Sequence, residues 1–205
     1  MLANGMNHIP PGKIAASVTF LDMDQRPHWL DEVQIASSIR LVPKDDISLT
    51  GYRELFRSVG ENWLWTSRLL ISDEELSSVI HCPSTSIYLI EVDGNIAGLS
   101  ELKQVNPTNI EIAFFGMRPE YTGRKLGKEI MALTLTVAWT ENTRKVSLQT
   151  CNFDHPAALT FYQKCGFQPV RFGIELMDDP RLTGTLPKGA APHIPLLNNG
   201  LAAPS

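Results

Sequence analysis

The stretch from Arg118 to Met131, RPEYTGRKLGKEIM, constrains the fold most. Gly123 and Gly127 stand between an apolar run that ends at Met117 and an apolar helical pattern that begins near Leu126. A strand that runs through a glycine turn into a helix N-terminus points several unpaired backbone N–H groups in one direction, which suits a pyrophosphate. The stretch therefore predicts a strand–loop–helix unit that binds phosphate. A plain turn before a solvated helix start would have the same composition.

Spacing excludes two familiar phosphate-binding loops. A Walker A loop has four residues between its glycines and then Lys and Ser or Thr, whereas here three intervene and Glu129 follows Lys128. A dinucleotide fingerprint follows the first strand of a parallel sheet, whereas this loop comes late in the chain, after predicted hairpins. Neither nucleotide-binding fold fits.

Strand and helix signals alternate along residues 15–179, which we expect to form a single domain. A capping box at Ser72 and Glu75 predicts a helix start, and Asp93-Gly94 predicts a hairpin turn. Gly166 closes a later predicted helix. Strands are expected at 17–23, 86–92, 96–104, 110–117, 145–151 and 167–176, and helices in parts of 50–70, after 72, from 124 and at 156–165. This order predicts an α+β fold whose mostly antiparallel sheet is flanked by helices.

Residues 1–14 and 180–205 are expected to be tails. The second is irregular and rich in Gly, Pro, Ala and Asn, although Ile194, Leu196 and Leu197 could dock on the domain or on a partner. No run is apolar enough to span a bilayer, so we expect a cytoplasmic protein without membrane partners.

Composition excludes several function classes. The 205 residues carry a net charge of -4, which disfavours general nucleic-acid binding. Cys82, Cys151 and Cys165 are widely spaced and form no CxxC pair, so neither a disulfide framework nor a metal site is expected.

Two segments in order, IEIAFFGMRPEYTGRKLGKEIMAL and VSLQTCNFDHPAALTFYQKCGF, resemble the GNAT superfamily of N-acetyltransferases. The resemblance covers residues 86–177 and implies the GNAT fold, an α/β sandwich-like arrangement with a mixed, twisted sheet. It also implies a pyrophosphate loop for acetyl-CoA and direct transfer of the acetyl group to a primary amine of a small molecule or a protein. Dimers are common in this fold, but no residue of the sequence supports a homodimer.

The resemblance assigns a set of residues to the cofactor. They are Phe115, Gly116, Met117, Thr122, Gly123, Arg124, Lys125, Leu126, Gly127, Lys128 and His155. Thr122 replaces the family's Gln or Arg, and Lys125 replaces its central Gly. We expect Lys125 to be helical, where a side chain is harmless, with its ammonium free to approach a phosphate. His155 either contacts the cofactor or simply sits at a helix N-terminus. These departures leave a catalytically weakened coenzyme-A-binding or interaction module as the alternative function.

Two side chains are candidates for the chemistry by the same resemblance. Tyr162 matches the family tyrosine that protonates the departing thiolate, and Glu111 matches a glutamate that serves some members as the base. The backbone N–H of Met117 is the expected oxyanion donor. Tyr162 could instead be a buried aromatic residue and Glu111 an outward strand residue, with water as the proton relay.

The acceptor is expected near the N-terminal helices. Trp63 and Trp65 could form walls of an amine pocket, and Arg68 could bind a substrate carboxylate. Glu101 is expected to lie near Glu111 across the hairpin, where two carboxylates would favour amine binding. The tryptophans could equally belong to the core and Arg68 to the surface.

Overall fold

The computed structural model describes residues 4–197, and residues 1–3 and 198–205 of the two expected tails lie outside the described residues. The strands are β1 (Lys13–Met23), β2 (Ile39–Pro43), β3 (Thr85–Val92), β4 (Asn95–Asn106), β5 (Asn109–Met117), β6 (Lys145–Cys151) and β7 (Gln168–Asp178). The α-helices are α1 (Leu49–Gly60), α2 (Asp73–Ile80), α3 (Gly127–Ala138) and α4 (Ala158–Cys165). Short 3₁₀ helices are η1 (His28–Asp31), η2 (Glu61–Trp63) and η3 (Pro119–Tyr121). No helix within residues 4–197 is long and apolar enough to cross a membrane.

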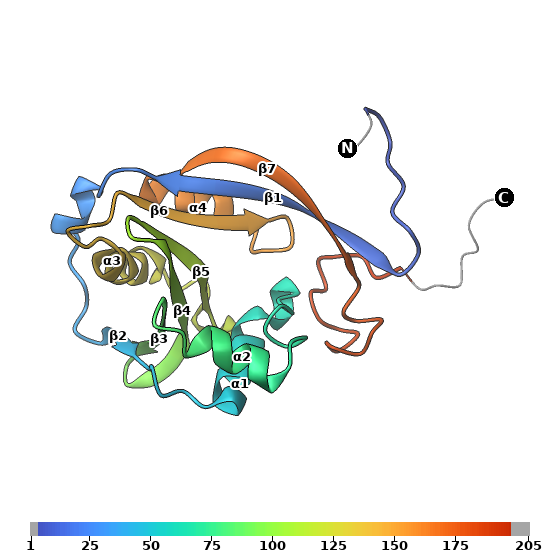
Figure 1. Cartoon of the computed structure of the whole chain (residues 1–205), viewed down its shortest axis with the longest axis horizontal. Coiled ribbons are helices and arrows are strands. Elements are labelled where there is room, and N and C mark those ends of the chain that lie inside the picture. The colour runs from blue at the N-terminus through green and yellow to red at the C-terminus, as the bar shows by residue number, and fades with distance from the viewer. Residues whose placement is uncertain (1–3, 198–205) are drawn as a thin grey trace.

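The strands form one mixed sheet in the order β2-β3-β4-β5-β6-β1-β7 (Figure 1). Only β5 and β6 pair in parallel, and the other neighbours are antiparallel. The prediction of an α+β fold with a mixed, mostly antiparallel sheet flanked by helices is confirmed. The sequence did not predict β2, nor that β1 is inserted between β6 and β7.

Helices cover both faces of the centre of the sheet through apolar side chains. On one face, α3 and α4 pack on β4, β5 and β6 through residues that include Met131, Leu135, Ile112 and Leu148. On the other face, α1 and α2 pack on β3 and β4 through a cluster that includes Phe56. The helices thus support the centre of the sheet from both sides, and Figure 1 shows β6, β1 and β7 leaving this centre as a separate ribbon.

Local signals in the sequence correspond to local structure. Ser72 and Glu75 form the predicted capping box at the start of α2. Asp93 and Gly94 both have positive φ in the turn between β3 and β4, and Gly166 ends α4 with a φ of 108°. Helix α3 begins at Gly127, three residues later than predicted.

Between β7 and residue 197 the chain forms no helix or strand, yet residues 180–194 pack against the domain. Leu186, Ala190 and Ala191 are buried in a cluster with β1 and Phe153. Arg181 is 2% exposed and bonds to Asp179 and to four backbone carbonyl groups of residues 190–195. The expected boundary at residue 179 therefore cuts through a buried ion pair.

Candidate active site

The site begins where β5 and β6 separate. Their parallel pairing stops at Ile112 and Leu148, while β5 continues to Met117 and β6 to Cys151 (Figure 1). The strand β5 keeps its other neighbour, β4, along this length. Its free edge therefore carries unpaired backbone groups that an extended ligand can bond.

A cavity of about 600 Å³ fills the opening. Cavities of roughly 300–1,000 Å³ are typical of small-molecule sites. Its walls come from β1, the residues after α1, the ends of β5 and β6, the loop before α3, the start of α4, and β7. Of the residues predicted for the cofactor, those that line it are Phe115, Gly116, Met117, Thr122, Gly123, Lys125, Leu126, Gly127 and His155.

The loop before α3 turns through two residues with positive φ. Gly123 has a φ of 78° and Lys125 a φ of 63°. The expectation that Lys125 is helical is therefore wrong. The loop needs a left-handed conformation at this position to bring the chain back to the start of α3. The Gly that the family has here would adopt this conformation easily. A side chain at such a φ costs roughly 1–2 kcal/mol.

The start of α3 has no side-chain cap. Leu126 occupies the N-cap position and offers no polar side-chain atom to the first turn. The N–H groups at the beginning of the helix remain available, and the helix dipole makes this end favourable for an anion. Gly127 lies where an added Cβ would be 3.2 Å from the Phe161 ring, so glycine lets α3 approach α4 closely.

Two basic residues of the loop lie away from the cavity. Arg124 is 3.7 Å from the carboxylate of Asp93 and lies over the Tyr121 ring, and the ammonium of Lys128 lies over the Trp29 ring. Neither lines the cavity, in contrast to Lys125. Of the three basic residues assigned to the cofactor, Lys125 is therefore the one that lies at the cavity wall.

Tyr162 reaches the cavity from α4. Burial raises the pKa of its hydroxyl, and the negative charge of Asp154 raises it further, so the phenol remains protonated at neutral pH. Within residues 4–197 the hydroxyl makes no hydrogen bond, although its ring packs beside Phe115, Phe161 and Phe167. The structure thus leaves a protonated donor free at the wall of the cavity.

His155 lies at the start of α4. Its Nδ1 accepts a hydrogen bond of 3.1 Å from the backbone N–H of Ala157, and its ring contacts Trp63 edge-on. His155 therefore lies just before the helix and lines the cavity, but it does not cap α4, whose N-cap residue is Ala157; its contact with the cofactor stays a prediction.

The two tryptophans form part of one end of the cavity. Trp63 lies between the rings of His155 and His193, with both centroids at 5.5 Å. The indole N–H of Trp65 donates to Asp154 Oδ1 at 3.3 Å. Asp154 Oδ2 accepts from Thr150 and from the backbone of Cys151, so the carboxylate ties this end of the cavity to β6.

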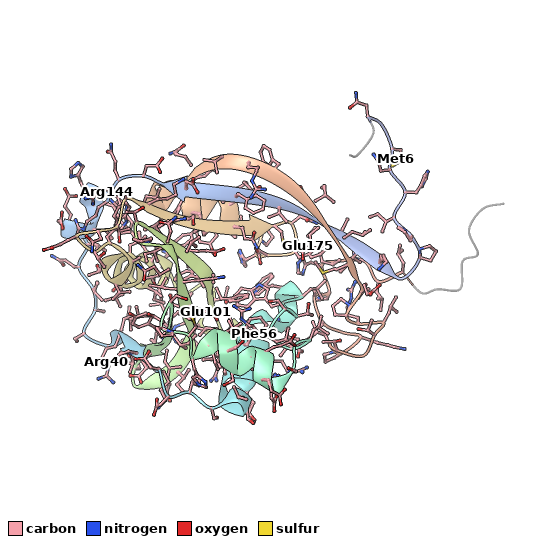
Figure 2. The ribbon with its side chains drawn as sticks, viewed as in Figure 1. Met6, Arg40, Phe56, Glu101, Arg144 and Glu175 are labelled. Carbon is pink, nitrogen blue, oxygen red and sulfur yellow. The ribbon has the colours of Figure 1, made fainter. Side chains whose placement is uncertain are left out.

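Arg68 and Glu101 belong to an internal cluster and not to the cavity wall. Glu101 is fully buried, 2.7 Å from Arg68 Nη2, and it accepts a hydrogen bond from the hydroxyl of Tyr52. Burial lowers the pKa of Arg68, but the charge of Glu101 outweighs this and raises it. Arg68 was predicted to bind a substrate carboxylate, but in the structure its guanidinium is paired with Glu101 and does not line the cavity. The guanidinium lies 5.0 Å from the centre of the Phe114 ring, which does line the cavity. Glu101 is labelled in Figure 2.

Glu111 lies in a different place from the other candidates. In the hairpin it is opposite Lys103, whereas Glu101 is opposite Phe114 after a register shift. Its side chain lines a second, polar cavity of about 240 Å³ together with Asp22, Lys145 and seven further residues of β1, β5, β6 and β7. The expected pair of neighbouring carboxylates does not form.

Sequence reasoning missed Asp154 and the contribution of β1 and β7. Asp154 follows a predicted strand in a turn, which is a recognisable position for an aspartate that bonds nearby backbone N–H groups. Ala16 and Val18 of β1 and Glu175 of β7 line the cavity through long-range pairing, for which no local signal exists.

Comparison with protein families gives a match over most of the domain. The family described as Acetyltransferase (GNAT) family matches residues 52–167, more than half of the chain. This match includes the loop, the separated strands and Tyr162.

Individual relatives are more distant. A Bacillus subtilis (strain 168) protein with the provisional name ribosomal protein bS18-alanine N-acetyltransferase is 28% identical over 97 residues, which are 47% of this chain and 63% of that protein. The chain thus spans less than two thirds of that relative.

Two solved structures illustrate the similarity of the fold. A conserved protein of unknown function from Staphylococcus epidermidis has a TM-score of 0.61 at 16% identity, over 82% of this chain and 64% of the other. A provisionally assigned GNAT acetyltransferase from Novosphingobium aromaticivorans has a TM-score of 0.55 at 17% identity, over 83% and 69%.

Proposed function

We propose that this chain, which belongs to the acetyltransferase (GNAT) family, transfers an acetyl group from acetyl-CoA directly to a primary amine of a small molecule or a protein. One observation carries the proposal. A free β5 edge, an uncapped helix start and a protonated Tyr162 all border one cavity of about 600 Å³.

The residues around the cavity fit coenzyme A. The N–H groups at the start of α3 and the ammonium of Lys125 would hold the pyrophosphate. The free edge of β5 from Phe115 to Met117 would bond the amides of the pantetheine arm, as an added strand does. Acetyl-CoA would supply the acetyl group as an activated thioester.

Three tasks remain for the protein. The backbone N–H of Met117 is the proposed donor to the oxygen that gains charge on the acetyl group. Tyr162 donates its proton to the sulfur that leaves, which its raised pKa permits because the phenol is protonated throughout the neutral range. The amine loses its proton to water in the cavity, because Glu111 lies in the second cavity and does not reach the first.

Direct transfer is preferred over transfer through a cysteine. Cys151 lines the cavity, but burial raises the pKa of its thiol to about 11. The thiolate is the nucleophilic form, and it is scarce at neutral pH under these conditions. Burial raises the pKa of Cys165 to about 11 as well.

The acceptor end of the cavity favours an amine with an apolar body. Its walls include Trp63, Trp65, Leu64, Phe153 and Met177. Arg68 is engaged by Glu101, so a substrate carboxylate finds no partner there. The name of the B. subtilis relative describes an alanine of a ribosomal protein as its acceptor, which makes a peptide N-terminus one candidate beside arylalkylamines.

The first test combines binding with turnover. Thermal denaturation with and without acetyl-CoA should show stabilisation of about 2.7 kcal/mol at 100 times the dissociation constant. Release of free thiol should then depend on an added amine, screened over alanine-initiated peptides, arylalkylamines and amino acids. Binding without amine-dependent release would instead support a coenzyme-A-binding module, and no binding would reject the proposal.

Tyr162→Phe tests the acid. We expect kcat to fall by about 10²-fold or more, as for loss of a general acid, with the affinity for acetyl-CoA unchanged. Glu111→Gln is the matched comparison, and its pH–rate profile should coincide with that of the wild type. A normal kcat for Tyr162→Phe, or a shifted profile for Glu111→Gln, would contradict the assignment concerned.

A further inference from the structure

The segment after β7 supports one end of the main cavity, the one of about 600 Å³, from outside. Figure 1 shows this segment beside the residues that follow α1 and near the start of β1. Three of its apolar residues, Leu186, Ala190 and Ala191, are buried but do not line the cavity. They pack in one cluster with four residues that do line it, namely Ala16, Val18, Leu64 and Phe153. The segment is therefore a second layer behind this part of the cavity wall.

Hydrogen bonds from two arginines hold the segment in place. The guanidinium of Arg181 is paired with Asp179 at 2.8 Å and donates to the backbone carbonyl groups of residues 190, 191, 194 and 195. Arg57 of α1 donates to the carbonyl group of Thr185 at 3.1 Å. These bonds fix the segment relative to both β7 and α1, so its side chains have defined positions behind the wall.

His193 connects the segment to Trp63, which lines the cavity. The centroids of their rings are 5.5 Å apart, with the planes tilted by 60°. Nε2 of His193 lies 3.0 Å from the carbonyl oxygen of Phe153. A carbonyl oxygen can only accept a hydrogen bond, so this nitrogen carries the proton and donates. The backbone at Phe153 therefore orients the imidazole ring that contacts Trp63.

Trp63 depends on such contacts for its position. It belongs to the three-residue helix η2, and the next residue, Leu64, has a left-handed φ of 56°. Short 3₁₀ helices have poor hydrogen-bond geometry, so the backbone alone gives the indole little support. Its ring contacts are with His155, which lines the cavity, and with His193, which does not. His193 can thus affect a ligand in the cavity through the residues of the wall that it contacts.

We propose that His193 is a specificity-determining residue for the acceptor, because its contact with Trp63 fixes one wall of the acceptor end. The inference rests on the proposed function, since it concerns the amine that is acetylated. It favours an arylalkylamine, whose flat apolar ring can pack against the indole. The family model matches residues 52–167, so His193 lies outside the part of the chain that defines the family. The choice of amine then depends on a segment that is particular to this chain.

Initial rates with phenylethylamine and acetyl-CoA test the proposal on the full chain. In His193→Ala, we expect KM for the amine to rise about three- to tenfold, as for the loss of one ring contact. KM for acetyl-CoA should stay within about twofold, because the other end of the cavity is unchanged. His193→Phe keeps a ring beside Trp63 and loses the bond to Phe153, so it should restore KM for the amine to within about twofold. Lys188→Ala, at an exposed position of the same segment, is the control and should have no effect.

A double-mutant cycle shows whether His193 acts through Trp63. Trp63→Ala should raise KM for the amine, and the addition of His193→Ala should raise it no further, because the contact is already lost. If His193 acted by another route, the two effects on the free energy of binding would add.

Several results would overturn the inference. They are an unchanged KM for the amine in His193→Ala, equal rises in KM for the amine and for acetyl-CoA, additive effects in the cycle, and a His193→Phe variant as impaired as His193→Ala. A wild type that acetylates alanine-initiated peptides but not phenylethylamine would do so too. In each of these cases the proposed transfer reaction stands. A wild type that acetylates no amine at all would instead reject the proposed function, and this inference with it.

Discussion

Replacement of Lys125 tests the backbone conformation of the loop before α3. Lys125 has a φ of 63°, a region in which a side chain costs roughly 1–2 kcal/mol and glycine costs almost nothing. Lys125→Gly should therefore be more stable than Lys125→Ala by about 1 kcal/mol. If Lys125 were helical, the order would be reversed, because alanine is favoured over glycine by about 0.8–1.0 kcal/mol inside a helix.

Thermal and urea unfolding of the two variants without ligand measure this difference. For a chain of this length, 1 kcal/mol corresponds to about 2–4 °C in melting temperature. Both variants lose the ammonium that borders the cavity, so that loss cancels between them. Lys125→Ala melting above Lys125→Gly would refute the left-handed conformation and restore the helical interpretation.

Titration with acetyl-CoA measures the effect of the Lys125 charge on cofactor binding, apart from the effect of its backbone conformation on stability. Both variants should bind more weakly than the wild type, and the difference should shrink at high salt, since it is an attraction between an exposed charge and phosphate. Equal affinity of all three proteins would show that the loop holds the phosphate through backbone groups alone.

Three further results follow from the buried pair and the cavity. Arg181→Met should destabilise by about 3–5 kcal/mol in urea unfolding, because it leaves Asp179 buried and unpaired, whereas Lys188→Met at an exposed position should stay within about 0.5 kcal/mol. Burial alone would raise the pKa of Asp179, but the bonds from Arg181 outweigh it and lower that pKa. The stability from this carboxylate is complete above its unfolded pKa of about 3.9 and is lost as the pH falls through the lower folded value, so Asp179→Asn should flatten the acid limb of a stability–pH curve. Trp63→Ala should raise KM for the amine more than for acetyl-CoA, measured by initial rates, and an equal rise in both would move Trp63 out of the acceptor end.

The parts of the fold that could be predicted rest on interactions between near neighbours. The capping box of Ser72 and Glu75 and the turn at Asp93-Gly94 are complete within four residues, so the sequence contains everything needed to recognise them. The loop before α3 was located for the same reason. Its internal conformation was not, because the left-handed φ of Lys125 depends on how α3 packs and not on the preference of lysine.

The candidate site was predictable only where its residues belong to one motif. Tyr162 and the end of β5 line the cavity, as the resemblance implied. Arg68 was assigned to a substrate because its internal partner, Glu101, is 33 residues away and lies on a strand. The separation of Glu111 from Glu101 depends on a register shift between β4 and β5, and no sequence pattern marks such a shift.

The place of β1 has a consequence for the order in which the chain can fold. A ribosome makes β1 first, yet both of its partners, β6 and β7, are made last. β1 can therefore pair with its neighbours only after nearly the whole chain has been synthesised. Pairing between strands so far apart in the sequence is slow. Lys13 at the start of β1 lies opposite Asp178 at the end of β7. A circular permutant with its ends joined and a new opening at Asp93-Gly94 would keep every strand pairing, while β6 and β7 would then be synthesised before β1. Its refolding rate, compared with that of the natural order, would measure how much the late arrival of these partners delays the protein.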